Sequence, residues 1–83
     1  MNIVIFGSTG GIGKALSYDL SHKHNIFIGS TNKNKIDKLK FDINQRNISN
    51  ANDYLADGVV VDATDFDSIK YFLNKANNFL GSI

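Results

Sequence analysis

The chain has 83 residues, of which 42% are hydrophobic and 20% are charged, so it is long enough for one small globular domain. No segment approaches the ~18 consecutive apolar residues of a membrane span, and no basic N-terminal region precedes an apolar core. We therefore expect neither a membrane helix nor a secretion signal. The absence of cysteine excludes disulfides and thiolate metal sites, and we expect a cytoplasmic protein.

The formal net charge of +1 argues against non-specific binding to nucleic acid, but the charge is unevenly distributed. Residues 1–41 carry six lysines and two aspartates, whereas residues 42–83 carry three cations and six aspartates. The basic first half can receive an anionic ligand, or its lysines can simply solvate helix faces. Both interpretations stay open at this point.

Hydrophobic patterning predicts alternating strands and helices along the chain. Apolar runs at residues 3–6 and 26–28 are typical of parallel strands that are buried on both faces. Between them, Ile12, Leu16 and Leu20 recur at helical spacing and predict a helix over residues 12–21.

The second half of the chain continues this alternation. A helix is predicted over residues 33–44 with Thr31 or Asn32 as its N-cap, and the polar residues 45–57 are predicted to form a loop with an extra turn around Tyr54 and Leu55. Residues 59–61 predict a strand because three valines follow one another. A last helix is capped by Asp65 or Asp67 and ended by Gly81.

The order βαβαβα predicts an α/β fold with a parallel sheet, the N-terminal half of an NAD(P)-binding Rossmann fold. We expect the strand order 3-2-1, which leaves the outer edge of the first strand free. Ile3 and Ile5 then lack the packing that the next half of the sheet would provide.

Four glycines (Gly7, Gly10, Gly11 and Gly13) lie between the first strand and the first helix. A turn at this place leaves free N–H groups at a helix start, and glycine lets a diphosphate approach the backbone closely. One glycine would suit a merely tight turn, whereas four in this context favour dinucleotide binding. The spacing is neither GxGxxG nor that of a P-loop.

The spacing GxxxGxG, within the stretch GGIGKAL, resembles the cofactor loop of the short-chain dehydrogenase/reductase family. The resemblance implies that the diphosphate loop consists of Gly7, Ser8, Thr9, Gly11, Ile12 and Gly13. The stretch VVVDATDFDSI resembles the third strand of that family and the turn after it, which implies that Asp62 and Ala63 border the adenine. The stretch NKANNFLGSI at residues 74–83 resembles the end of the helix before the fourth strand.

Two departures from the family pattern concern the loop. Phe6 stands where the family usually has threonine, which bears on a structural contact and not on the phosphate site. Gly7, Gly10 and Gly13 also satisfy the GxxGxxG of the extended branch, so the loop alone leaves the branch open, and the stretch DATD favours the main branch.

The resemblance implies an oxidoreductase that transfers a hydride between a nicotinamide cofactor and a carbonyl or alcohol substrate. The family's catalytic Tyr–Lys pair, Ser and Asn lie beyond the fourth strand, so we expect residues 1–83 to be a partial domain without catalytic residues, and the full-length protein to be a homo-oligomer. The alternatives are a stand-alone nucleotide-binding or sensor module without catalysis, and a truncated product without function.

The residues after the second strand favour NADP over NAD. No carboxylate lies between Asp19 and Asp37, where an acidic residue would accept from the ribose of NAD. A 2′-phosphate would instead meet Ser30, Thr31 and Asn32 as donors, with Lys33 or Lys35 as counter-charge.

Other candidate sites are rejected. Tyr71 and Lys75 have the YxxxK spacing of the catalytic pair but lie on the wrong helix, and we expect a packed ring beside a surface ammonium. His22 and His24 have no nearby third ligand, so no metal site is predicted, and an interaction with a helix C-terminus is expected instead.

Overall fold

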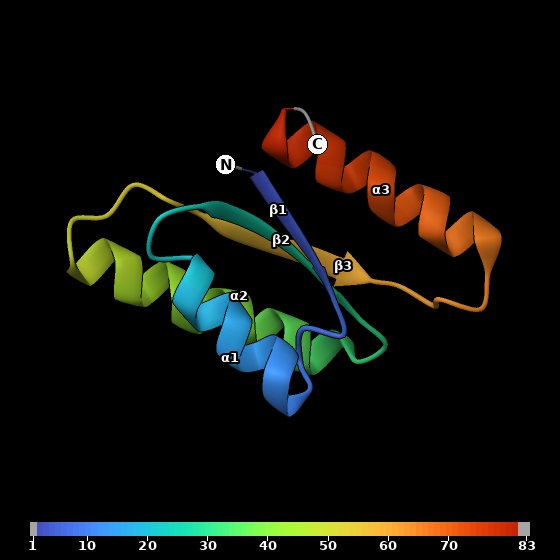
Figure 1. Cartoon of the computed structure of the whole chain (residues 1–83), viewed down its shortest axis with the longest axis horizontal. Helices are drawn as coiled ribbons and strands as arrows, with labels where there is room; N and C mark the ends of the chain where they lie inside the picture. The colour runs from blue at the N-terminus through green and yellow to red at the C-terminus, as the bar shows by residue number, and fades with distance from the viewer. Residues whose placement is uncertain (1, 82–83) are drawn as a thin grey trace.

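The computed structural model describes residues 2–81, which form a three-stranded parallel sheet with helices on both faces (Figure 1). In chain order the elements are β1 (Asn2–Phe6), α1 (Gly11–Leu20), β2 (Asn25–Ser30), α2 (Lys33–Ser49), β3 (Ala56–Val60) and α3 (Phe66–Leu80). The predicted order βαβαβα and the parallel sheet are confirmed. Ser82 and Ile83, the end of the stretch compared with the family's helix ending, lie outside the described residues.

Strand β2 lies between the other two strands, so the predicted order is confirmed and β1 occupies one edge of the sheet. The register places Ile5 beside Ile28, and Ile28 beside Gly58. Gly58 lies so close to β2 that an added Cβ would contact the carbonyl oxygen of Ile28. The lack of a side chain at this position therefore lets β3 approach the central strand.

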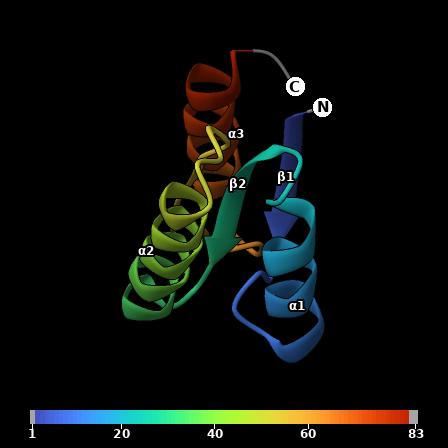
Figure 2. The same cartoon turned by 90° about the vertical axis from the view of Figure 1, so that its left-hand side faces the viewer.

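Two apolar clusters cover the two faces of the sheet. Helices α1 and α2 lie on one face and α3 on the other (Figure 2). The cluster on the side of α2 consists of Ile26, Ile28, Ile36, Leu39, Ile43 and Ala56. The cluster on the side of α3 consists of Phe27, Val61, Phe72, Ala76 and Leu80. Adjacent residues of β2 thus point to opposite faces, as in a strand that is buried on both sides.

The predicted caps of the last two helices are confirmed. The Asn32 side chain accepts a hydrogen bond from the N–H of Lys35, and the Asp65 side chain accepts from the N–H groups of Asp67 and Ser68. Gly81 ends α3 with a φ of 84°, a left-handed conformation that glycine adopts at low cost.

The predicted loop over residues 45–57 is wrong at both ends. Helix α2 continues to Ser49, the turn lies at Asn50 and Ala51 rather than at Tyr54 and Leu55, and β3 already begins at Ala56. The loop was predicted because this segment is polar. The last turn of α2 is nevertheless anchored in the core by a polar residue, Asn47, which is buried and hydrogen-bonded.

Helix α1 buries less of its apolar stripe than its spacing predicts. Ile12 is 81% exposed and Leu16 is 46% exposed, whereas Leu20 packs against the cluster on the side of α2. The small Ser17 is the one residue of α1 that is fully buried, and its hydroxyl donates to the carbonyl oxygen of Gly13. None of the helices within residues 2–81 is long and apolar enough to cross a bilayer.

Candidate dinucleotide-binding site

The loop after β1 is anchored to the carboxyl end of β2. Gly7 has a φ of 68°, and the N–H groups of Gly7 and Ser8 donate to the carbonyl oxygen of Gly29 at 2.8 and 3.2 Å. The Ser8 hydroxyl donates to the same oxygen at 3.1 Å, and Ser8 is completely buried. Because the Ser8 side chain points into the protein, this residue fixes the loop rather than offering its hydroxyl to the surface.

The first turn of α1 packs tightly against this loop. The N–H of Gly10 donates to the carbonyl oxygen of Gly7 at 3.1 Å. A Cβ added to Gly13 would contact that same oxygen and would lie 2.9 Å from the Cα of Ser8. A Cβ added to Gly11, in contrast, would meet nothing within 4 Å. Gly13 is therefore required by packing, whereas Gly11 faces open space.

The start of α1 is a cluster of free donors. Among residues 2–81, the N–H groups of Thr9, Gly11, Ile12 and Gly13 have no hydrogen-bond acceptor, and the first helical bond runs from Lys14 to Gly10. The N-cap Gly10 provides no side-chain cap, and the first turn contains no acidic residue. The positive end of the helix dipole is thus uncompensated, which favours an anion at this place.

The end of β2 lies directly beside the glycine loop. The hydroxyls of Thr9 and Ser30 are 2.7 Å apart, so the structure brings together two residues from the two predicted parts of the site. Ser30 also accepts from the N–H of Asn32, and the Asn32 side chain is engaged in capping α2. Three residues were predicted around the ribose, and two of them, Ser30 and Asn32, are engaged in these hydrogen bonds. The third, Thr31, is exposed, and its side chain forms no hydrogen bond among the described residues.

A cleft of about 270 Å³ opens between α1 and α2 next to this point. It is lined by Thr9, Lys14, Tyr18, Lys35, Lys38, Leu39 and Asp42. Lys14 and Lys35 form no ion pair among the described residues, whereas Lys38 pairs with Asp42 at 3.0 Å. The cleft therefore presents two ammonium groups that form no ion pair beside the glycine loop, although the charge of Lys14 also reaches Asp42 and helps to lower its pKa.

The acidic end of the cleft is internally paired. The hydrogen bond from Lys38 lowers the pKa of Asp42, and Asp42 in turn raises the pKa of Lys38. Partial burial, followed by the charge of Asp42, raises the pKa of the Tyr18 hydroxyl, which donates to Asp42 at 3.4 Å. Tyr18 is therefore protonated at neutral pH and acts as a donor.

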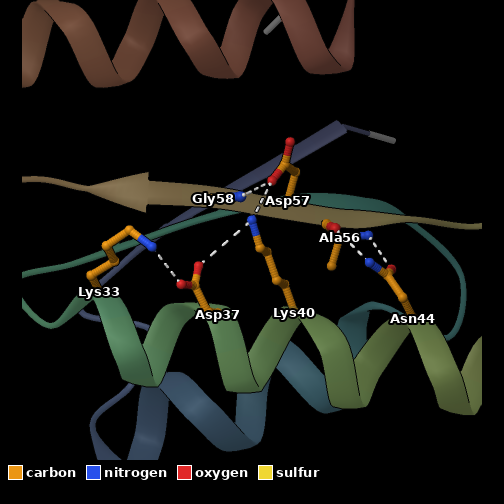
Figure 3. Close-up of polar contacts among 7 residues, drawn as sticks. All are labelled: Lys33, Asp37, Lys40, Asn44, Ala56, Asp57 and Gly58. Atoms are coloured by element: carbon orange, nitrogen blue, oxygen red, sulfur yellow. Dashed lines mark hydrogen bonds and ion pairs between the residues drawn. The ribbon is translucent and has the colours of Figure 1, made fainter.

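The sequence predicted Lys33 or Lys35 as the counter-charge to a 2′-phosphate, and the structure places only Lys35 at the cleft. The Lys33 ammonium pairs with Asp37 at 2.7 Å on the side of α2 that faces β3 (Figure 3), and Lys33 does not line the cleft. Sequence reasoning missed Lys14 and Lys38 as lining residues. The position of Lys14, directly after the last glycine of the loop, was the available signal.

Asp62 and Ala63 follow β3 at the same carboxyl edge of the sheet, and both are exposed. The Asp62 carboxylate accepts hydrogen bonds from the hydroxyl of Thr64 at 2.7 Å and from its N–H at 2.9 Å. These bonds lower the pKa of Asp62, so the group is ionised at neutral pH. The third strand thus ends in a fixed acceptor, at the edge where ligands of open α/β sheets bind.

The rejected candidates are distributed elsewhere. The Lys75 ammonium lies 5.5 Å from the centre of the Tyr71 ring, so both residues share one face of α3, but Tyr71 is 54% exposed and its predicted packing is wrong. His22 and His24 follow the end of α1, and no group of residues between 2 and 81 could hold a metal ion.

Comparison with known proteins gives a clear result for structure alone. No family model and no curated protein matches the sequence. A short-chain dehydrogenase from Mycobacterium smegmatis matches 99% of the chain with a TM-score of 0.86 and 12% identity. An alcohol dehydrogenase from the archaeon Thermococcus sibiricus, complexed with 5-hydroxy-NADP, matches 96% with a TM-score of 0.85 and 20% identity.

An actinorhodin polyketide ketoreductase solved with NADPH matches 96% of the chain with a TM-score of 0.84 and 16% identity. The chain spans about a third of the length of these structures, namely 33%, 32% and 29% of the three proteins in the order given. The described chain therefore has the fold of about one third of a short-chain dehydrogenase/reductase structure, in agreement with the predicted fold class.

Proposed function

We propose that this chain is the NADP(H)-binding portion of an oxidoreductase of the short-chain dehydrogenase/reductase type. The observation that carries the proposal is the uncapped start of α1, where free N–H groups surround the open space over Gly11 and a lysine-lined cleft begins at Thr9. Two of the structures with the same fold were solved with NADPH or 5-hydroxy-NADP, which supports this choice of ligand.

The proposed binding mode follows from the positions of the donors. The diphosphate would accept from the N–H groups at the start of α1, and Gly11 would let it approach the backbone. The ammonium groups of Lys14 and Lys35, which line the cleft, and the hydroxyl of the exposed Thr31 would receive the 2′-phosphate. The Asp62 carboxylate would accept from the adenine amino group, because it is ionised and exposed.

The reaction class is proposed from the resemblance. When bound, a nicotinamide cofactor supplies the hydride that reduces a carbonyl to an alcohol, or accepts it in the reverse direction. The resemblance places the family's catalytic residues beyond the fourth strand, and the described chain has three strands, so we assign this chain to cofactor binding and propose that further polypeptide supplies the catalytic residues.

The second candidate is a stand-alone nucleotide-binding module. It is favoured by the two buried clusters, because each face of the sheet has its own apolar core without any residue from outside the chain. Both candidates predict dinucleotide binding. They differ in whether the intact native protein, isolated from its host, reduces carbonyl compounds with NADPH.

A titration with NADPH and NADH, followed by the fluorescence of the reduced nicotinamide, tests the binding site. We expect the native chain to bind NADPH more tightly than NADH. The double variant Lys14→Gln, Lys35→Gln should lower the affinity for NADPH by about tenfold, because it removes two charge-assisted contacts to phosphate, and should leave the affinity for NADH almost unchanged.

The matched control is Lys33→Gln, which lies on the same helix but pairs with Asp37 outside the cleft. This variant should retain the preference for NADPH. If Lys33→Gln weakens NADPH binding as much as the double variant does, the loss of affinity results from the lower net charge of the protein, and the assignment of the cleft is wrong. If the native chain binds neither cofactor, the proposed function itself is wrong.

A further inference from the structure

The outer edge of β3 lies on the opposite side of the sheet from β1. The carbonyl oxygen of Leu55 and the N–H of Val61, at the two ends of the strand, form hydrogen bonds with β2. Since backbone groups alternate in direction along a strand, those of Ala56, Gly58 and Val60 face outward. These outward groups are the ones that a strand of another molecule would use.

Asn44 closes the first outward residue of this edge. Its side-chain amide donates to the carbonyl oxygen of Ala56 at 2.9 Å and accepts from the N–H of Ala56 at 2.8 Å (Figure 3). A neighbouring strand would form the same two bonds with the same residue. Because Asn44 belongs to α2, a side chain of this helix occupies the place of a further strand at the start of β3.

Lys40 and Asp57 protect the next outward residue. The Asp57 carboxylate accepts from the N–H of Gly58 at 2.8 Å, and the Lys40 ammonium donates to the same carboxylate at 3.2 Å. Figure 3 shows Lys40 extending from α2 past the strand toward Asp57, and its ammonium also lies 3.8 Å from the carboxylate of Asp37. A strand that approached Gly58 would have to displace these ion pairs.

Val60 is the one outward residue of β3 whose backbone forms no hydrogen bond with a side chain among residues 2–81. The next N–H in the alternation, that of Asp62, donates to the Ser68 hydroxyl at 2.9 Å. Val60 is therefore open between two closed neighbours. A single open residue is too short for a ladder of strand bonds.

The edge is protected by these bonds rather than by a covering element. A hollow of about 510 Å³ opens between α2 and α3 at the start of β3, and another of about 380 Å³ opens at its end. Lys40 and Asp37 line both hollows. Phe41, Leu55 and Val60 also line them and are exposed. The surroundings of the edge are thus accessible and partly apolar, which are the conditions that favour pairing of exposed strands.

We propose that Asn44, Lys40 and Asp57 act as an edge guard, which prevents the outer edge of β3 from pairing with β3 of a second copy of this chain. The guard consists of groups of the described chain itself. It therefore acts whether or not further polypeptide extends the sheet beyond β1. The inference goes beyond the proposed function, because the guard includes no residue of the glycine loop or of the lysine-lined cleft.

Sedimentation velocity of the full native protein and of the double variant Lys40→Met, Asn44→Ala tests the guard over a wide range of concentrations. We expect the double variant to form species larger than any that the native protein forms, in an amount that rises with concentration. The reason is that the backbone of Ala56 is released and the ammonium no longer lies at the edge.

Two controls separate the guard from other effects of substitution. Gln45→Ala is the matched control, since Gln45 is exposed on the same helix, lines the same hollow and forms no side-chain hydrogen bond among the described residues. Gly13→Ala controls for lost stability, because its new methyl group overlaps the carbonyl oxygen of Gly7 and is remote from this edge. Both variants should sediment as the native protein does.

Hydrogen exchange gives a readout that a merely structural role of Asn44 would not produce. In the native protein the amide of Ala56 should be protected at every concentration and should exchange more slowly than that of Val60. In the double variant the amide of Ala56 should lose its protection at low concentration and regain it as molecules pair at high concentration. Lost stability alone would lower the protection at every concentration.

Three results would overturn the inference. One is a folded double variant that sediments as the native protein does at every concentration, and another is Gly13→Ala that associates to the same extent as the double variant. The third is a native amide of Ala56 that exchanges as fast as that of Val60, which needs no variant to fold. NADPH binding is titrated separately on the same samples. A failure of the guard and a failure of the proposed function can therefore be distinguished.

Discussion

Replacing Asn47 with alanine is expected to lower the free energy of unfolding by about 3 kcal/mol, because it leaves several buried polar groups without partners. The Asn47 amide donates to the carbonyl oxygens of Ser21 at 3.1 Å and Tyr54 at 2.9 Å. Its oxygen accepts from the guanidinium of Arg46, which also donates to the carbonyl oxygen of Tyr18 and to the hydroxyl of Ser21.

Urea denaturation of the two proteins, followed by circular dichroism, measures this difference. Asn34→Ala is the matched control, since Asn34 lies exposed on the same helix and its side chain forms no hydrogen bond among the described residues. The control should unfold within about 0.5 kcal/mol of the native chain. Equal, small effects of both substitutions would contradict the assignment of Asn47 as the residue that connects α1, α2 and the segment before β3.

Asn47 also explains where prediction from sequence fails. The strands and helices with clear apolar periodicity were predicted correctly in kind and order, because burial of those residues determines the elements directly. The last turn of α2 and the first residues of β3 have no such pattern. They are held by side-chain bonds to the backbone, from Asn47 to Tyr54 and from Asn44 to Ala56, between partners that are not neighbours in the sequence.

The candidate site shows the same division. The glycine loop and the ends of the three strands could be predicted, because a strand–glycine–helix order is a local property of the sequence. Of the three lysines that line the cleft, Lys35 was named from the sequence, whereas Lys14 and Lys38 were not, because they lie on different helices and meet only when α1 packs beside α2. The spacing of the glycines also says nothing of their separate roles, which depend on contacts between Gly13, Gly7 and Ser8.

Those separate roles lead to opposite expectations for two substitutions in the loop. Gly13→Ala should lower the free energy of unfolding by about 2 kcal/mol, because the new methyl group overlaps the carbonyl oxygen of Gly7 and lies against Ser8, whose backbone cannot yield without losing its bonds to Gly29. Gly11→Ala should leave the stability unchanged or raise it slightly, because the methyl group enters open space at a helical position.

Binding of NADPH separates the two variants in a second way. Gly11→Ala should weaken NADPH by about tenfold although the protein stays fully folded, since the methyl group occupies the space through which the diphosphate would reach the free N–H groups. Thermal unfolding together with the fluorescence titration measures both quantities. Gly11→Ala with native affinity would place the anion elsewhere, because no other role for a glycine at this position follows from its backbone conformation or its contacts. If Gly13→Ala is the only destabilised variant, and it loses NADPH affinity only to the extent that it is unfolded, Gly13 belongs to the architecture of the loop and Gly11 to the contact with the ligand.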